Sequence, residues 1–437
     1  MTQTRTTTVS PFRALWRAAG RLSLAAVLAV PLAHVPISDA DARPAKKARK
    51  AAQKPRTALP KSVRLAARAP IEIEPTTGNR DTPVLTRDAI LATDAGRLAR
   101  IGQHVMIGYH SYSAVKALVE KKAIAGVFIT DHNVRGRRAA DVKADVDALQ
   151  AVRKEQGLPP LIIAADQEGG QVSRLSPPLK RQPSLAYILK TLDNDEARRA
   201  AVEAYAETQA AELKRIGVTL NFAPVVDLNL DPKNRSDGET HLRLRAIAAD
   251  PYLVSKVASW YCDVFAKHGL MCTLKHFPGL GRVKRDTHRV SGEVVASEGQ
   301  LELNDWVPFR RVMSKSNVAT MLGHVRVAVI DKTTPASFSH TIISTLIRDT
   351  WKHDGLLITD DLSMGAVTRS KAGVGGAAVK ALDAGADIVL VSYSEKHLDT
   401  VMSALIAADA KGEIDAEARG KSETRLARIL KENISSD

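Results

Sequence analysis

Gly355-Leu-Leu-Ile-Thr-Asp360 is a short apolar run that begins at a glycine and ends at an acidic side chain. A continuous apolar run of this length is typical of a strand that is buried on both faces. Seven further runs of this kind occur along the chain, and longer amphipathic segments rich in Ala, Glu, Lys and Arg separate them. In chain order the eight runs are residues 104–109, 126–130, 161–166, 218–224, 271–277, 318–324, 355–360 and 386–393.

Buried strands that alternate with helices predict an α/β fold with a parallel sheet covered on its faces. Eight strand–helix units favour a single (β/α)8 TIM-type barrel, whose active site lies at the carboxyl ends of the strands. An open doubly wound sheet would gather ligand groups at one switch point instead. Five polar residues lie at or near the ends of four of the runs, which favours the barrel: Asp166, Lys275, His276, His324 and Asp360.

The lengths of the connections also bear on the fold. The excess length follows the third, fourth and fifth runs, so we expect long βα loops that shape a substrate cleft. The C-terminal region, residues 399–433, has a helical composition, and we expect it to pack outside the barrel as the last helix. We find no metal motif and expect no cofactor.

The first 82 residues differ from the rest. The chain has 437 residues and a formal net charge of +15, but residues 1–70 hold 14 Lys or Arg against 2 Asp or Glu, which leaves +3 for the remainder. Residues 1–42 combine an arginine-rich start, an apolar stretch over residues 22–33 and small residues at the end, which predicts a secretory signal peptide. Residues 43–82 are basic and lack apolar periodicity, which predicts a disordered linker. We therefore expect export to the periplasm.

The same composition argues against two kinds of partner. The positive charge lies in a tail without interleaved aromatic residues, so we expect no nucleic-acid partner. The apolar stretch is too short to cross a bilayer stably, so we expect no membrane span after processing, and a retained anchor is the alternative.

Cys262 and Cys272 are the two cysteines of the chain. We expect them to be separate buried thiols, and a disulfide is the alternative.

The chemistry is concentrated after the fifth run. Lys275-His276-Phe277-Pro278-Gly279 is followed by Asp286-Thr287-His288, which brings a cation, two imidazoles and a carboxylate into one loop region. An Asp two residues before a His can hold the ring and fix its tautomer. Such a histidine can give and take a proton near neutral pH, so this loop is a candidate hydrolytic site.

Three blocks of sequence resemble glycoside hydrolase family 3 enzymes of the NagZ type, which are β-N-acetylglucosaminidases (β-N-acetylhexosaminidases) that act on peptidoglycan fragments. The blocks are Asp166-Gln-Glu-Gly-Gly-Gln-Val-Ser-Arg174-Leu, the run from Lys275 to His288, and Ile358-Thr-Asp360-Asp-Leu-Ser-Met364. The resemblance implies a single-domain barrel over residues 83–433. It also implies a carbohydrate substrate, with terminal GlcNAc of peptidoglycan fragments as the sugar released.

The resemblance further implies a role for each matching residue. Asp360 would attack the sugar as the nucleophile, while His288, held by Asp286, would replace the second carboxylate as acid and base, so that the anomeric configuration is retained. Asp361 is expected to cap the following helix. The residues that match substrate-binding positions are Asp166, Arg174, Arg245, Lys275 and His276.

Several assignments have alternatives. Arg243 competes with Arg245, because the segment Leu242-Arg-Leu-Arg245 departs from the pattern of the family. Glu168 is expected only to brace Arg174, and His324 is as consistent with a core histidine as with a ligand. The alternative functions are a β-glucosidase or glycoside phosphorylase of the same family, or an inactive carbohydrate-binding protein. The Asp-x-His pair together with Asp360 favours a hydrolase, because a binding protein needs no nucleophile.

Overall fold

The computed structural model describes residues 82–233, 238–392 and 394–434. The predicted signal peptide (1–42) and all but the last residue of the predicted linker (43–82) lie outside the described residues.

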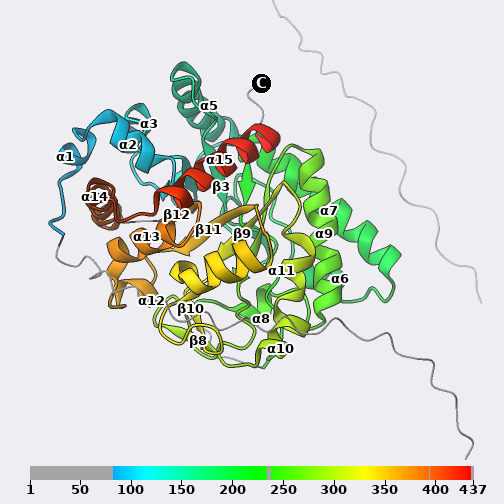
Figure 1. The fold of residues 1–437 in the computed structure, drawn as a ribbon. Coiled ribbons are helices and arrows are strands. Elements are labelled where there is room, and N and C mark those ends of the chain that lie inside the picture. The colour runs from blue at the N-terminus through cyan, green and yellow to red at the C-terminus, as the bar shows by residue number, and fades with distance from the viewer. Residues whose placement is uncertain (1–81, 234–237, 393, 435–437) are drawn as a thin grey trace, which may run out of the picture. The chain divides into compact units, whose positions relative to one another are not determined.

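Eight parallel strands form the barrel (Figure 1), and each corresponds to one of the eight apolar runs. In chain order the strands are β1 (Val105–Gly108), β2 (Gly126–Ile129), β3 (Ile162–Ala165), β6 (Leu220–Asn221), β7 (Cys272–Phe277), β9 (Val318–Leu322), β11 (Leu356–Asp361) and β12 (Ile388–Val391). Spatial neighbours run in the order β6-β3-β2-β1-β12-β11-β9-β7. The amide of Asn221 donates to the carbonyl of Met271 at 2.9 Å and joins β6 to the start of β7. The predicted (β/α)8 barrel is therefore confirmed.

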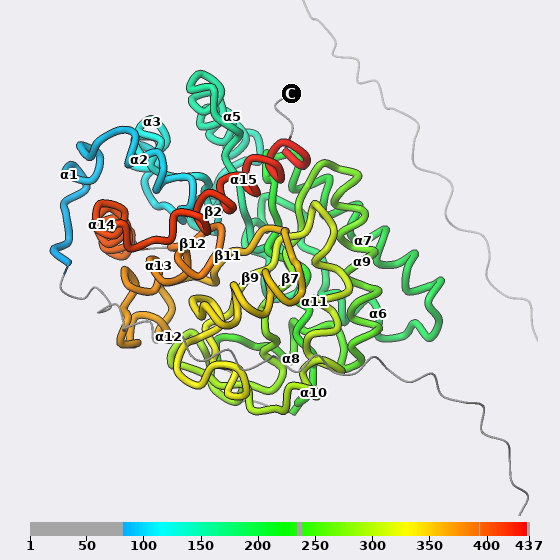
Figure 2. The backbone as a smooth tube through the Cα atoms, viewed as in Figure 1, coloured from blue at the N-terminus to red at the C-terminus, as the bar shows by residue number. Residues whose placement is uncertain are grey.

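Helices cover the outside of the sheet (Figures 1 and 2). Their starts follow ordinary capping rules, since Asn194 accepts from the amide of Ala197 and Asp250 precedes Pro251 at the first helical position. The helices between or beside the barrel strands are α1 (Arg87–Leu91), α2 (Ala95–Gly102), α3 (Tyr112–Glu120), α5 (Ala139–Glu155), α7 (Asp195–Arg215), α9 (Pro251–Lys267), α11 (Val307–Val312), η3 (Thr341–Thr350), α13 (Gly373–Asp383), α14 (Glu395–Lys411) and α15 (Ala416–Asn433).

Shorter elements lie in the loops that leave the carboxyl ends of the strands. They are α4 (Asp131–Val134), β4 (Gln167–Gly169), β5 (Val172–Ser173), α6 (Leu185–Leu189), α8 (Leu242–Arg245), β8 (Gly292–Val294), α10 (Glu298–Gln300), η1 (Leu301–Asp305), β10 (Val325–Val327), η2 (Ala336–Phe338) and α12 (Gly365–Thr368). The predicted long βα loops are thus present and carry structure of their own.

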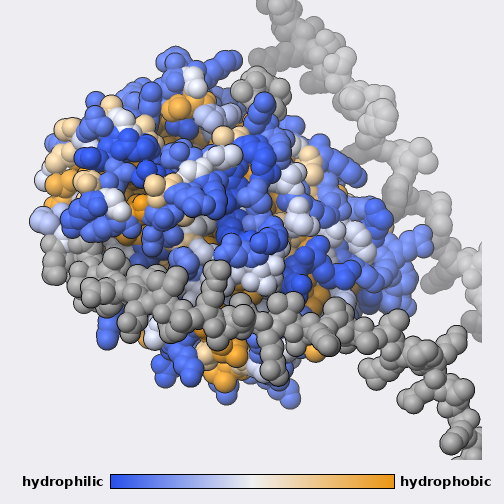
Figure 3. All heavy atoms as spheres, in the orientation of Figure 1, coloured by the Kyte–Doolittle hydropathy of each residue, from blue (hydrophilic) through white to orange (hydrophobic). Residues whose placement is uncertain are grey.

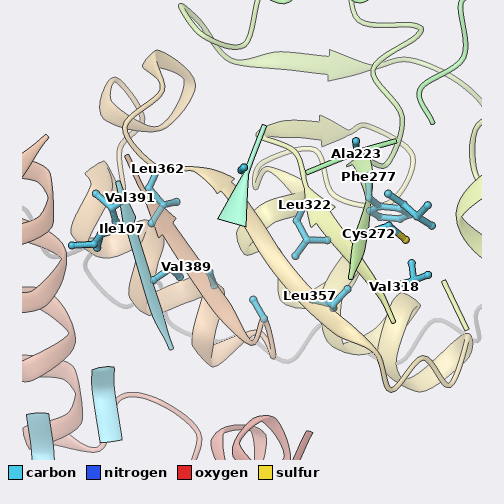
Figure 4. Packing of buried hydrophobic residues seen from close by; sticks show 14 of the residues in the cluster. Ile107, Ala223, Cys272, Phe277, Val318, Leu322, Leu357, Leu362, Val389 and Val391 are labelled. Atoms are coloured by element: carbon cyan, nitrogen blue, oxygen red, sulfur yellow. The ribbon is translucent and has the colours of Figure 1, made fainter. Parts of the chain in front are cut away.

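The strands bury both faces, as their continuous apolar sequences require. On β3, Ile163 and Ala165 belong to the core between sheet and helices, while Ile162 and Ala164 belong to the core inside the barrel. Figure 4 shows residues of the outer core, among them Leu357 and Val389, on neighbouring strands.

The C-terminal helical region differs from the prediction in two ways. It forms two helices, because Gly412 ends α14 in the left-handed conformation, at φ 70°. Leu426, Ile429 and Leu430 of α15 belong to the core inside the barrel, and Arg425 pairs with Asp387 just before β12. The last helix therefore closes the amino-terminal end of the barrel, whereas α14 packs against α13 and α2 on the outside. The expectation of packing outside the barrel is confirmed for α14 and was wrong for α15.

The two cysteines form a disulfide, so the prediction of separate thiols was wrong. Cys262 lies on the buried side of α9, Cys272 opens β7 (Figure 4), and their Cα atoms are 5.6 Å apart. Composition indicated correctly that both are buried, but only the tight return from α9 into β7 places them opposite one another.

The surface is mainly hydrophilic on the face drawn in Figure 3, where hydrophobic side chains form small separate patches. Among the helices of the described residues, none is long and apolar enough to cross a membrane.

Candidate active site

One pocket at the carboxyl ends of the strands contains most of the predicted site residues. Its empty volume, including its open mouth, is about 840 Å³. The predicted residues that line it come from the ends of four strands and the loops that follow them, and are Asp166, Arg174, Arg245, Lys275, His276, His288 and Asp360. Asp286 lies directly behind His288, so the structure brings all eight predicted residues together.

Asp360 lies half-buried near the end of β11, where its Oδ1 accepts from the amide of Asp361 at 2.8 Å. Burial alone would raise the pKa of this carboxyl. The neighbouring His276, His324 and His288, together with that amide, hold the pKa below its usual value. Asp360 is therefore an ionised carboxylate at neutral pH, as a nucleophile requires.

Asp361 does not cap the following helix, contrary to the prediction. The residue that precedes α12 is Met364, and Asp361 accepts instead from the amides of Ser363 and Ser392, each at 2.9 Å, and from the Ser392 hydroxyl. This carboxylate ties the end of β11 to the residue after β12. The tie fixes the backbone beside Asp360.

His288 and Asp286 form the expected pair, with 2.9 Å between His288 Nδ1 and Asp286 Oδ1. Asp286 is buried and also accepts from the Glu239 amide at 2.5 Å and the Thr240 hydroxyl at 2.9 Å. Burial opposes ionisation, but these hydrogen bonds hold the pKa of Asp286 below its usual value. Because Asp286 occupies Nδ1, the other ring nitrogen of His288 is the one available to a ligand in the pocket.

The loop that carries this pair is held by a small parallel sheet. β8 lies just after His288 and pairs with β10, which follows β9. Arg326 of β10 donates to the hydroxyl of Ser291 at 2.8 Å. These contacts fix the path of the long polar loop that carries Asp286 and His288.

Four charged side chains form a largely buried network beside the pocket. Lys275 Nζ lies 2.5 Å from Asp166 and 2.6 Å from Glu168, and Arg245 contacts both oxygens of Glu168 at 2.9 and 2.6 Å. Burial would raise the pKa of Glu168, but the charges of Arg245 and Lys275 lower it to about 2. Glu168 therefore braces Arg245 and Lys275, and the prediction that it braces Arg174 was wrong.

The structure also distinguishes the two competing arginines. Arg245 lines the pocket, whereas Arg243 lines a separate hollow beyond Thr240 and Leu280. Both belong to the single turn α8, and their side chains leave it in different directions. This agrees with the choice of Arg245 for the pocket.

His324 is fully buried and is satisfied on both ring nitrogens. Nδ1 lies 2.7 Å from the Ser337 hydroxyl and Nε2 lies 2.9 Å from the Asp361 carbonyl. It is a core histidine that supports the backbone beneath Asp360, in agreement with the first of its two alternative interpretations.

Sequence reasoning missed three polar residues of the site. Thr240 contacts Asp286, Ser392 binds Asp361, and Asp227 pairs with His276. Asp227 carried a usable signal, because it follows the fourth apolar run in Phe222-Ala-Pro-Val-Val-Asp227. Thr240 lies in a loop without periodicity, and nothing in its surroundings marked it.

A (β/α)8 barrel whose pocket contains an ionised Asp and an Asp-supported His, beside polar groups suited to hydroxyls, has the architecture of a glycoside hydrolase. Residues 98–429 match the glycosyl hydrolase family 3 N-terminal domain. The chain belongs to glycosyl hydrolase family 3, and it groups there with β-hexosaminidases, as its sequence blocks predicted.

Among its relatives is a β-hexosaminidase of Xylella fastidiosa strain M23, 36% identical over 279 residues, which cover 63% of this chain and 78% of that protein. β-Hexosaminidase LpqI of Mycobacterium tuberculosis is 29% identical over 336 residues, which cover 75% and 81%.

Solved structures agree. A family 3 β-N-acetylglucosaminidase of Paenibacillus sp. strain FPU-7 superimposes with a TM-score of 0.70 at 29% identity, over 77% of this chain and 62% of that one. The structure of M. tuberculosis LpqI gives 0.67 at 27% identity, over 80% and 97%. This chain thus spans less than two thirds of the Paenibacillus protein.

Proposed function

We propose that the protein is a retaining exo-β-N-acetylglucosaminidase that releases terminal GlcNAc from peptidoglycan fragments. The observation that carries the proposal is that Asp360, near the end of β11, and His288, which Asp286 supports from behind, line one pocket. An ionised carboxylate and a proton donor on opposite sides of a pyranose are the two groups that retention requires.

In the proposed reaction, Asp360 attacks the anomeric carbon while His288 protonates the departing oxygen, which breaks the glycosidic bond and leaves a glycosyl-aspartate. His288 then takes a proton from water, the water oxygen bonds to the anomeric carbon, and the carboxylate leaves. Asp286 holds the ring in one tautomer and stabilises the imidazolium that forms in the second step.

Sugar recognition is assigned to the buried network. Asp166 accepts from ring hydroxyls, Lys275, Arg245 and Arg174 supply donors, and His276 presents its Nε2 to a sugar hydroxyl. Because Glu168 holds Lys275 and Arg245 in place, these donors are arranged before the substrate arrives, which reduces the entropy lost on binding.

The test uses an aryl β-GlcNAc substrate, with the matching aryl β-glucoside as the control for the sugar. We expect turnover of the first substrate, weak turnover of the second, and a loss of more than about a thousandfold in kcat/KM in Asp360→Ala.

A second experiment traps the intermediate. A 5-fluoro GlcNAc donor should leave its adduct on the peptide that contains Asp360. An adduct elsewhere or inverted product stereochemistry would contradict the mechanism, and release of GlcNAc from chitin oligomers but not from muropeptides would contradict the substrate.

We also propose that the chain is exported to the periplasm, with residues 1–42 removed. The pattern of residues 1–42 and the Cys262–Cys272 disulfide support this, because disulfides persist in oxidising compartments. Cell fractionation followed by mass measurement of the mature chain should find a protein that lacks these residues. An intact Met1 in the cytoplasmic fraction would contradict the proposal.

A further inference from the structure

A second carboxylate–imidazole pair lies beneath the pocket. Asp227, in the loop after β6, is fully buried, and its Oδ2 lies 2.7 Å from Nδ1 of His276 at the end of β7. Asp227 does not line the pocket, whereas His276 does. The pair therefore has the same chemical composition as Asp286 and His288, and its carboxylate is likewise closed off from the pocket.

Among the described residues, the hydrogen bonds of the Asp227 carboxylate lead to one short segment. Its two oxygens accept from the amide of His276 at 3.1 and 3.2 Å, and Oδ1 also accepts from the amide of Leu280 at 2.7 Å. The carboxylate thus holds both the backbone and the ring of His276. With a carboxylate acceptor at 2.7 Å, Nδ1 carries a proton, and Nε2 is the nitrogen left to face the pocket.

This arrangement matters because of what His276 faces. His276 lines the pocket with Asp360 and makes the largest favourable contribution to keeping that carboxylate ionised. A ring that rotated, or that carried its proton on the wrong nitrogen, would lose its contact with a sugar hydroxyl. A buried carboxylate at Nδ1 prevents both changes.

We propose that Asp227 is a positioning residue for the glycosidase, which acts through His276 by fixing the ring with its Nδ1 proton toward Asp227 and Nε2 toward the substrate. The inference rests on the proposed function for the reaction that it serves, although the state of the ring can be measured without any turnover. The competing explanation is a structural role, in which Asp227 merely holds the loop through the Leu280 amide.

The first arm of the test observes the ring itself. Protein labelled with 15N-histidine is examined by NMR at neutral pH, and the His276 signals are assigned from their loss in His276→Ala. We expect Nδ1 of His276 to be protonated in the wild type and this preference to be lost in Asp227→Asn. An unprotonated Nδ1 in the wild type would overturn the inference, even if Asp227→Asn fails to fold.

The second arm is a double-mutant cycle on the aryl β-GlcNAc substrate. Asp227→Asn should raise KM by about tenfold to a hundredfold with a smaller change in kcat, the range found when an outer carboxylate partner of a functional histidine is removed. In a His276→Ala background the same substitution should change KM less than about threefold, because its target is gone. An equal change in both backgrounds would assign Asp227 a structural role and overturn the inference.

Asp305→Asn is the matched control. Asp305 is a buried carboxylate whose Cβ packs against Gly279 of the same loop, but its ion pair is with Arg282 at 2.8 Å. The Asp305→Asn variant should therefore keep its KM within about threefold of the wild type.

A wild-type protein without turnover would contradict the proposed function, whereas an unchanged tautomer in Asp227→Asn would overturn this inference at any level of turnover.

Discussion

The amide of Gly365 donates a hydrogen bond to the carbonyl of His288 across 2.8 Å. Gly365 begins α12, five residues beyond Asp360 in the chain, and the next amide, Ala366, donates to the carbonyl of Thr287 at 3.3 Å. The two segments that carry the proposed nucleophile and the proposed acid/base are therefore joined backbone to backbone. The distance between Asp360 and His288 therefore depends on how closely these two segments of the chain approach each other.

Gly365 permits that approach because it has no side chain. A Cβ at this position would lie 2.4 Å from the carbonyl oxygen of Arg289 and 2.7 Å from that of His288, both of them backbone atoms. Gly365→Ala should push the loop away from β11 and lower kcat by about tenfold to a hundredfold, since a displacement of 1 Å can have that effect. Steady-state kinetics measures this change.

Gly420→Ala on α15 is the control, because a Cβ there meets nothing within 4 Å. It should keep wild-type kinetics and gain a little stability, as alanine favours helix. Unchanged kcat in a folded Gly365→Ala protein would show that the loop tolerates the shift.

His288→Ala tests the acid role through the leaving group. Departure of a sugar or alkyl oxygen needs a proton, so kcat/KM should fall by about a hundredfold to ten-thousandfold on such substrates. A dinitrophenyl leaving group needs no proton, and kcat/KM on that substrate should stay close to the wild type. Comparison of the two substrates measures the effect, with His340→Ala on the exposed surface as the control. An equal loss on both would assign His288 another role.

His276→Ala should move the acid limb of the activity profile. Because the pKa of Asp360 lies below its usual value, wild-type kcat/KM should persist into the acidic range and fall only when this carboxylate is protonated. Removal of His276 removes the largest contribution that favours the carboxylate, so the pKa of Asp360 rises and the acid limb moves to higher pH. The pH dependence of kcat/KM on a dinitrophenyl substrate checks this, and a limb that stays in place would contradict it.

Glu168→Gln should destabilise the fold through the buried network. The variant leaves Lys275 and Arg245 without half of their compensating charge, which should cost about 3–5 kcal/mol at pH 7. The pKa of Glu168 is about 2 in the folded protein against a usual 4.5. The stability that this shift contributes, about 3 kcal/mol, is present above pH 4.5 and is lost as pH falls toward 2.

Urea unfolding of both proteins between pH 7 and pH 2 measures this. The difference in unfolding free energy between wild type and variant should shrink as pH falls from 4.5 toward 2. Glu203→Gln, in an exposed pair with Arg199 at 2.8 Å, is the control and should change stability by less than about 1 kcal/mol. A difference in unfolding free energy that does not depend on pH would contradict the assignment of the low pKa to Glu168.

Much of the site could be predicted from the sequence, because it lies at strand ends. Asp166, Lys275 and Asp360 each end an apolar run, and parallel strands bring their carboxyl ends to one edge of the barrel. His288 was found by its local Asp-x-His pattern, which depends on two positions in the chain. Glu168 was placed beside the wrong arginine, since the path of the loop from β6 to α8 has no periodic signal.

The sequence alone determined the eight strands, their parallel order and the face that carries the chemistry, because runs of buried residues and their spacing are properties of the chain itself. The tertiary structure decided that Cys262 meets Cys272, that α15 closes the barrel, that Arg245 rather than Arg243 enters the pocket, and that Asp227 holds His276. Each of these depends on where irregular loops place side chains from distant segments. Packing and hydrogen bonding between those segments select one path among many that the local sequence allows.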